Sequence, residues 1–331
     1  MSTRVRALMA LVILVAAACG GGGNAPISLP VASGQPQLWP LRGTSAPDGD
    51  AVRKRPIVVK VAADPSARPQ SGLADADLII EIPVEGGLTR LSVVFQSKDP
   101  QKVGPVRSAR QSDLQYLPVI HAIVAHVGAS EQVTKLVRDA AKSGDFVDVD
   151  EFQHGDAFER TTDKPAPYNA YTTGAKIRQV GGSDKVNVPS LKFGDAASGG
   201  ADAPSVTVAI NEAIKYDYDS GKNAYHRSYA GGQKTTDATA GEVMPENVVV
   251  IKTDVNEIPG TADAAGAPSV DYRGTGSGPV VVLRDGKRLE GTWSRQGSEM
   301  YRFADGSGKE ILLKPGLTWI AIVPVSFDLS G

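Results

Sequence analysis

The sequence predicts an α/β (or α+β) N-terminal domain built on a mixed sheet, followed by a mainly antiparallel β C-terminal domain. Three observations predict this. Short apolar runs rich in β-branched residues recur from Ile57 onward, which is typical of strands. A segment with helical spacing at 130–141 lies between two such runs and indicates a strand–helix–strand unit. After a stretch rich in Gly, Ser, Ala and Asp at 181–204, turn signals such as Asp285-Gly286 join the remaining runs and favour hairpins.

The first residues have the pattern of an export signal that ends in a lipidation site. A basic start is followed by an apolar run to Ala18, and the run is about a dozen residues long, short of the roughly 20 that span a bilayer. Cys19, the only cysteine in 331 residues, follows three alanines, as in the lipobox of bacterial lipoproteins. We expect residues 1–18 to be removed and Cys19 to be acylated, and two acyl chains would keep the protein on the membrane.

Composition excludes several classes of function. Once Cys19 is acylated, no thiol remains for a disulfide, a zinc–cysteine site or a cysteine nucleophile. The formal net charge of −2 does not favour nucleic acid as a partner. We expect no metal and no cofactor, and a hydrophobic content of 41% is typical of a globular body.

The chain divides into segments of different composition. Residues 19–54 carry the lipidated cysteine and then scattered Gly, Pro, Ser and Asp without periodicity, so we expect a disordered tether. We place the N-terminal domain at 55–190 and the C-terminal domain at 204–326.

Within the N-terminal domain we expect strands at 57–61, 77–82, 91–95, 119–124 and 146–149. Ser130 is the expected N-cap of the helix, with Glu131 favourable at its positive end and Gly144 closing it. We also expect a hairpin in which residues 91–95 pair with residues 103–107 across a turn near Pro100.

Within the C-terminal domain we expect strands at 206–210, 247–252, 280–283, 289–293 and 319–323. Residues 235–246 and 257–268 are expected to be long surface loops. Trp293 and Trp319 lie on expected strands, where burial in the core is favoured over an exposed platform for sugars.

Several motifs resemble a known family. They are Arg55-Pro56-Ile57-Val58-Val59, Ala67-Arg68-Pro69-Gln70-Ser71-Gly72-Leu73, Val84-Glu85-Gly86-Gly87-Leu88-Thr89-Arg90, Val103-Gly104-Pro105-Val106-Arg107-Ser108-Ala109-Arg110 and Leu313-Lys314-Pro315-Gly316-Leu317-Thr318-Trp319-Ile320. Together they resemble the YerB-like lipoproteins, a two-part family of domains of unknown function. The sequence departs from the family pattern at Pro167-Tyr168-Asn169, where a Pro-His-Asn step is usual. The resemblance implies location and architecture but no reaction.

Arg90, Arg107 and Arg110 form the most suggestive group of charged residues. If the expected hairpin holds, Arg110 falls beside Arg90, and like charges that close need an anion between them. That anion is either one of the protein's own carboxylates, of which Glu85 is a near candidate, or a bound group such as phosphate. Internal ion pairs are favoured over a ligand site.

Other candidate residues give weaker signals. His126 lies at the carboxyl end of an expected strand, where ligands collect in open α/β sheets, and Asn169 is the other candidate ligand-site residue. His121 and His126 are expected on opposite faces of one strand, which excludes a shared metal. Asp77 and Glu81 lie about 13 Å apart along a strand, too far for a glycosidase pair.

Three functions remain open at this point. We favour a non-catalytic binding or assembly factor of the bacterial cell envelope, lipid-anchored on the extracytoplasmic face of the cell membrane, with an envelope protein or a wall polymer as its partner. The first alternative is a phosphate-recognising enzyme acting on wall or lipid-linked intermediates, with the arginines as an anion clamp. The second is a solute-binding lipoprotein.

Overall fold

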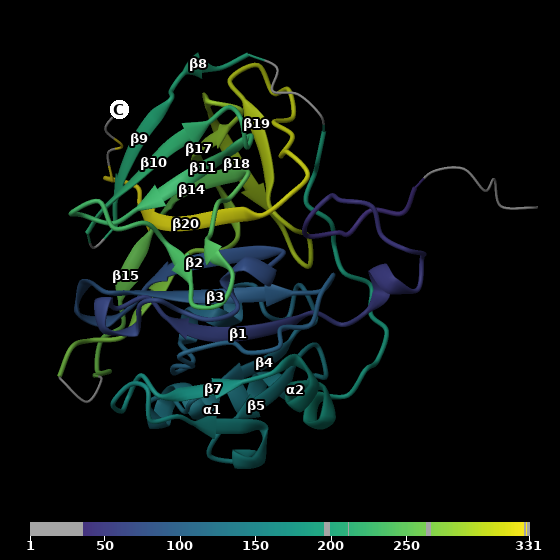
Figure 1. Ribbon diagram of the computed structural model, residues 1–331, viewed down its shortest axis with the longest axis vertical. Helices are drawn as coiled ribbons and strands as arrows, with labels where there is room; N and C mark the ends of the chain where they lie inside the picture. The colour runs from purple at the N-terminus through teal and green to yellow at the C-terminus, as the bar shows by residue number, and fades with distance from the viewer. Residues whose placement is uncertain (1–35, 195–198, 211, 263–265, 328, 330–331) are drawn as a thin grey trace, which may run out of the picture. The chain divides into compact units, whose positions relative to one another are not determined.

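The computed structural model describes residues 36–194, 199–210, 212–262, 266–327 and 329. Within them the chain forms a mixed eleven-stranded sheet to which both halves of the sequence contribute (Figure 1). The strand order along its main path is β19-β18-β17-β14-β20-β2-β3-β1-β4-β5, and β8 pairs with β18. Cys19 and the expected signal peptide lie outside the described residues. The disordered tether expected at 19–54 is wrong for residues 36–54, because Trp39 and Leu41 are buried and Leu41 belongs to the hydrophobic core.

The N-terminal part supplies one half of this sheet. Its strands there are β1 (Ile57–Ala62), β2 (Leu78–Pro83), β3 (Thr89–Phe95), β4 (Ile123–His126) and β5 (Val147–Asp150). The same part holds α1 (Glu131–Ala141), α2 (Gly174–Gly181) and a small ladder of β6 (Phe158–Arg160) with β7 (Ala170–Thr172). Short 3-10 helices include η4 (Glu85–Gly87) and η5 (Gln111–Gln115).

The C-terminal part supplies the other half and a second layer. Its strands in the large sheet are β8 (Ala201–Asp202), β14 (Asn247–Thr253), β17 (Gly276–Arg284), β18 (Lys287–Arg295), β19 (Arg302–Asp305) and β20 (Thr318–Pro324). The second layer is an antiparallel sheet of β9 (Ser205–Ala209), β10 (Ala213–Asp219) and β11 (Ala224–Ser228), which packs on β14 and β17. Two short ladders complete this part: β12 (Thr236–Asp237) with β13 (Gly241–Glu242), and β15 (Val255–Glu257) with β16 (Val270–Tyr272).

The strand–helix–strand unit that the sequence predicts is confirmed. β4 and β5 pair in parallel, and α1 connects them. The helix begins where Ser130 Oγ accepts a hydrogen bond from the backbone N–H of Val133, and it buries Val133 and Val137 against the sheet. The expected turn at Asp285-Gly286 is also confirmed, since both residues have the positive φ that such a turn requires.

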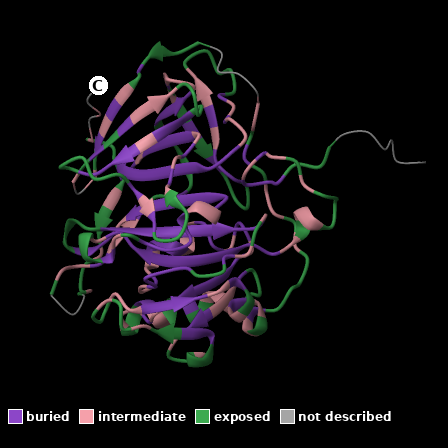
Figure 2. Ribbon diagram, in the orientation of Figure 1, coloured by how far each residue is buried: buried purple, intermediate pink, exposed green. Residues whose placement is uncertain are grey.

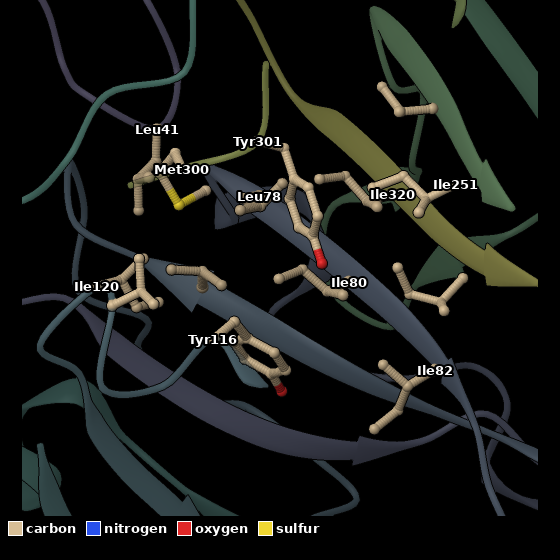
Figure 3. Packing of buried hydrophobic residues seen from close by; sticks show 14 of the residues in the cluster. Leu41, Leu78, Ile80, Ile82, Tyr116, Ile120, Ile251, Met300, Tyr301 and Ile320 are labelled. Atoms are coloured by element: carbon tan, nitrogen blue, oxygen red, sulfur yellow. The ribbon is translucent and has the colours of Figure 1, made fainter. Parts of the chain in front are cut away.

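The two parts share one hydrophobic core. β2 and β20 pair in parallel from Leu78 opposite Thr318, and the buried strands continue through this junction (Figure 2). Figure 3 shows Leu78 and Ile80 of β2 close to Ile320 of β20 in the same cluster. The mixed sheet in the N-terminal part and the strand-rich C-terminal part are therefore joined without a break, while the boundaries expected at 190 and 204 stay a prediction.

The expected hairpin between residues 91–95 and 103–107 is wrong. β3 is antiparallel to β1 on one side and to β2 on the other, so neither edge is free for a third strand. Residues after β3 instead bind a buried carboxylate, because the backbone N–H groups of Gln96 and Ser97 both donate to Asp77. The segment 103–107 makes only isolated bridges to other parts of the chain.

The expected strand at 119–124 is also displaced. β4 begins at Ile123, and His121 lies in the preceding turn with a φ of +52°. The prediction that His121 and His126 lie on opposite faces of one strand is therefore wrong, because only His126 lies in β4.

Some elements were not expected from the sequence. α2 begins and ends with glycine, which hides its helical period. In β10 every second residue from Ile214 is apolar or aromatic, but the charged residues between them mask the strand. The expected loop at 235–246 contains the short ladder of β12 and β13, whereas Trp293 and Trp319 are fully buried, as predicted.

Candidate anion-binding site

The three arginines come together at the carboxyl end of β1, although the hairpin expected to join them does not exist. Arg90 on β3 lies opposite Ala62, the last residue of β1. Arg107 donates its backbone N–H to the carbonyl of Lys60 (2.8 Å) and accepts from Val127 (3.0 Å). The charges of Arg107 and Arg110 are near enough to Arg90 to lower its pKa.

Arg90 is a buried cation whose ion pair with Asp64 includes no hydrogen bond. Its side chain is almost inaccessible, with 2% of the residue exposed. The nearest carboxylate oxygen, Oδ2 of Asp64, is 3.6 Å from Nη1, beyond hydrogen-bond distance. Among the described residues, Nε and Nη1 of Arg90 have no hydrogen-bond partner, nor has Oδ2 of Asp64. Burial, followed by the charges of Arg110 and Arg107, lowers the pKa of Arg90 to about 10.

Arg107 is half-buried and also incompletely paired. Its guanidinium lies over the ring of Tyr168, with 5.6 Å between Cζ and the ring centroid. Its Nε has no hydrogen-bond partner within the described part of the chain. Burial lowers the pKa of Arg107, Asp64 and Tyr168 oppose this, and the charges of Arg110 and Arg160 add to it.

Arg110 differs from the other two because the protein supplies its anion. Its Nε donates to Oε2 of Glu85 at 2.6 Å, and Glu85 is itself buried. Its backbone N–H donates to Asp113 (2.8 Å), which fixes the start of η5. The internal pairing that the sequence favoured therefore describes Arg110, while Arg90 and Arg107 keep unused donors.

A cavity of about 520 Å³ opens beside Arg107 and Arg110, whereas Arg90 is not among the residues that line it. Its walls come from the loop before η5, the turn at η4 and the first turn of α1, and they include Glu85, Arg107, Ser108, Arg110, Ser130 and Glu131. Guanidinium donors such as that of Arg107 suit an anion of the size of a phosphate group.

Lys60 lies in a closed network behind the arginines. Its Nζ donates to Asp113 and to Ser92 Oγ (2.6 Å), and Tyr116 OH donates to the same carboxylate (2.9 Å). Burial lowers the pKa of Lys60 to about 8, although Asp113 opposes this. Because its side chain is fully buried, Lys60 supports the loop rather than contacting a ligand.

The two carboxylates considered for glycosidase chemistry are both occupied. Asp77 binds the backbone after β3, as described above. Glu81 accepts from Nη2 of Arg227 (3.0 Å), Nε1 of Trp319 (2.9 Å) and the hydroxyl of Thr89 (2.8 Å). Neither is free to protonate or attack a substrate.

His126 has a supporting position. It is buried at the end of β4, as expected, and its Nδ1 lies 3.0 Å from the carbonyl of Gly128 while Nε2 lies 2.7 Å from Asp148. Both partners are acceptors, which favours the imidazolium form, in which both ring nitrogens donate. Burial disfavours that charge, but Asp148 and Asp150 outweigh it and raise the pKa of His126.

Asn169 lies next to the arginine cluster through Arg160. Its Oδ1 accepts from Nη1 of Arg160 (2.9 Å), and Arg160 also binds both carboxylate oxygens of Glu151. The sequence did not indicate Asp64, Arg160 or Tyr168 as site residues, although Tyr168 lies in the Pro167-Tyr168-Asn169 step that departs from the family pattern. They come close to Arg107 only through tertiary folding, because all three are far from it in the sequence.

Within the residues that the structure describes, no group of three or more His, Cys, Asp or Glu side chains could hold a metal ion. In the same residues, no helix is both long and apolar enough to cross a membrane.

Comparison with known proteins identifies the family. Residues 41–187 match the N-terminal domain, and residues 205–320 the C-terminal domain, of a family described as "Protein of unknown function (DUF3048)". A protein of Bacillus subtilis (strain 168) named "Putative lipoprotein YerB" is 31% identical over 296 residues, 86% of each chain. The chain belongs to the DUF3048 family.

The fold is that of a family member as well. The crystal structure of the YerB protein from Bacillus subtilis is similar to this chain with a TM-score of 0.76 and 29% sequence identity. The match covers 89% of this chain and 100% of the YerB chain. The resemblance inferred from the sequence motifs is confirmed.

Proposed function

We propose that the protein is a lipoprotein on the extracytoplasmic face of the membrane and that it binds a phosphate-bearing component of the cell envelope without transforming it. The location rests on Cys19 and the signal-like segment before it, and on the lipoprotein name of the Bacillus subtilis relative. The acyl chains hold the body where wall polymers and lipid headgroups carrying phosphate are found.

The binding activity rests on Arg107, which lines the cavity with an unpaired Nε, and on the buried charge of Arg90 near it. A buried guanidinium with two unpaired nitrogens costs stability, because burial removes water without supplying a partner. A phosphate bound in the cavity would pair with Arg107, and its charge would offset the repulsion that Arg107 and Arg110 exert on the buried Arg90 behind them. Asp64 alone does not satisfy Arg90, because its Oδ2 lies 3.6 Å from Nη1, beyond hydrogen-bond distance.

Binding is favoured over catalysis by the state of the reactive groups. Lys60, Asp77 and Glu81 are buried and fully engaged, and His126 uses both ring nitrogens structurally. A phosphate-recognising enzyme would need a nucleophile or a general base within reach of the arginines.

A sedimentation assay tests the proposal. Full-length protein in detergent is mixed with envelope fragments before and after chemical removal of phosphate polymers. We expect the protein to sediment only with fragments that keep their phosphate, and Arg107→Glu to abolish this. Arg302→Glu, which reverses a partly exposed arginine on β19 at the other end of the sheet, is the matched control.

Three results would contradict the proposal. Equal sedimentation of the Arg107→Glu variant would show that Arg107 does not contribute to binding. Retention by phosphate-free fragments would favour a protein partner instead, and release of free phosphate during the assay would favour the enzyme.

A further inference from the structure

Phe152 is an exposed aromatic side chain that the protein holds in place. It follows β5, and 78% of it is exposed, the largest value among the exposed large hydrophobic residues in the described part of the chain. Its backbone N–H donates to Oδ1 of Asp150 (3.2 Å), and the same oxygen accepts from the N–H of Gly128 (2.9 Å). One buried carboxylate therefore fixes both segments, so the exposure of Phe152 is built into the loop.

The ring rests on the backbone of Gly128. A Cβ on that residue would lie 2.5 Å from Cε2 of Phe152, so only glycine leaves room for the ring. The φ of +58° at Gly128 also favours glycine. An edge of the ring is thus supported while most of its surface faces solvent, which is unfavourable unless something covers it.

This ring lies next to the arginine cluster. The carbonyl of Gly128 accepts from the N–H of Ala109 (3.0 Å), between Arg107 and Arg110, and the next residue, Ala129, lines the cavity. Glu151 lies between Phe152 and Asp150 in the chain, and its ion pair with Arg160 runs toward Asn169. The ring is therefore joined to the cavity wall through Gly128 and to Arg160 and Asn169 through Glu151, although it is not itself among the residues that line the cavity.

We propose that the anion bound by the arginines is a phosphate carried on a sugar, and that Phe152 is the platform for the sugar ring. A sugar ring offers apolar C–H groups on its face and hydroxyls on its edge, which match an aromatic ring flanked by Glu151, Arg160 and Asn169. A bare phosphate would leave the ring uncovered. This inference rests on the proposed binding of phosphate and specifies its ligand class.

Calorimetric titration of full-length protein in detergent tests the inference with two matched probes. N-acetylglucosamine 1-phosphate carries a ring, whereas glycerol 1-phosphate carries the same phosphate without one. We expect the sugar phosphate to bind about tenfold more tightly than glycerol 1-phosphate, a factor within the range of aromatic contacts. Phe152→Ala should remove this preference and leave the affinity for glycerol 1-phosphate unchanged, while Phe152→Trp should restore it.

Leu38→Ala is the control, because Leu38 is also an exposed apolar residue but lies in the segment that packs on residues 191–193. Equal affinities for the two probes in the unmodified protein would overturn the inference while leaving the proposed phosphate site intact. An undiminished preference in Phe152→Ala would also overturn it. If neither probe binds, the proposed function fails as well.

Discussion

Replacing Arg90 with methionine is expected to stabilise the ligand-free protein while destroying its anion site. Arg90 is a charged group in a nearly inaccessible position, and its nearest carboxylate oxygen is 3.6 Å away. Methionine is flexible enough to fill the space left by the side chain without burying a charge.

The magnitude follows from the pKa of Arg90, which burial and the neighbouring arginines lower from 12.5 to about 10. Each pKa unit corresponds to about 1.4 kcal/mol, so the charged form is disfavoured by roughly 3 kcal/mol. Because Asp64 loses its nearest cation in the variant, we expect a net gain of about 1–2 kcal/mol in the free energy of unfolding.

Arg227→Met is the matched control. Arg227 is as buried as Arg90, but it donates to Glu81 (3.0 Å), Tyr216 OH (3.1 Å) and Thr235 Oγ1 (2.9 Å). Its removal leaves a buried carboxylate unpaired and should destabilise the protein by about 3–5 kcal/mol.

Urea denaturation followed by far-ultraviolet circular dichroism measures both variants. In phosphate-free buffer, the midpoint should rise for Arg90→Met and fall for Arg227→Met. Addition of phosphate at about 100 times its dissociation constant should stabilise the unmodified protein by about 2.7 kcal/mol and leave Arg90→Met unchanged. A loss of stability in Arg90→Met as large as that in Arg227→Met would refute the reasoning, because Arg90 would then be structurally paired.

Three further predictions concern the surrounding structure and the anchor. Because the folded pKa of His126 is raised above 6.5, its stabilising contribution is complete below pH 6.5 and is lost as the pH rises through the folded value; unfolding free energies measured from pH 5 to 9 should show this decline, and Asp148→Asn should flatten it. Lys60→Met should cost about 3 kcal/mol in urea unfolding, since Asp113 stays buried without its cation; an unchanged midpoint would show that the pair does not stabilise the fold. Cys19→Ala should end palmitate labelling and release the protein into the medium, whereas a labelled variant would place the acyl group elsewhere.

Local patterns predicted the elements whose cause is local. Ser130 caps α1 through its own hydroxyl, and Val133 and Val137 follow at helical spacing, so the helix could be placed from the sequence alone. The turn at Asp285-Gly286 likewise depends on two adjacent residues that tolerate positive φ.

Pairing between distant segments could not be read in the same way. The run at 103–107 has the composition of a strand, but Val103, Gly104 and Val106 bridge to Thr172, Ser71 and Val61 instead of to one neighbouring strand. The sequence favours a hairpin between residues 91–95 and 103–107 because a hairpin is the shortest connection between two strand-like runs. The true partners lie between 33 and 69 positions away in the sequence, where no residue pattern marks them.

The candidate site shows both outcomes. The sequence groups Arg90, Arg107 and Arg110 through an expected hairpin; they do come together, but at the carboxyl end of β1 and without that hairpin. The pairing of Arg110 with Glu85 agreed with expectation, whereas the incomplete pairing of Arg90 could only be seen once burial was known. The exposure of Phe152 could not be predicted, because a single aromatic residue in a polar loop does not indicate a binding surface.

The most direct test of the anion site is a calorimetric titration of full-length protein with inorganic phosphate at low salt. The account predicts saturable binding at one site in the unmodified protein and none in Arg90→Met or Arg107→Glu. Saturable binding that survives in both variants, or its absence from the unmodified protein, would contradict it.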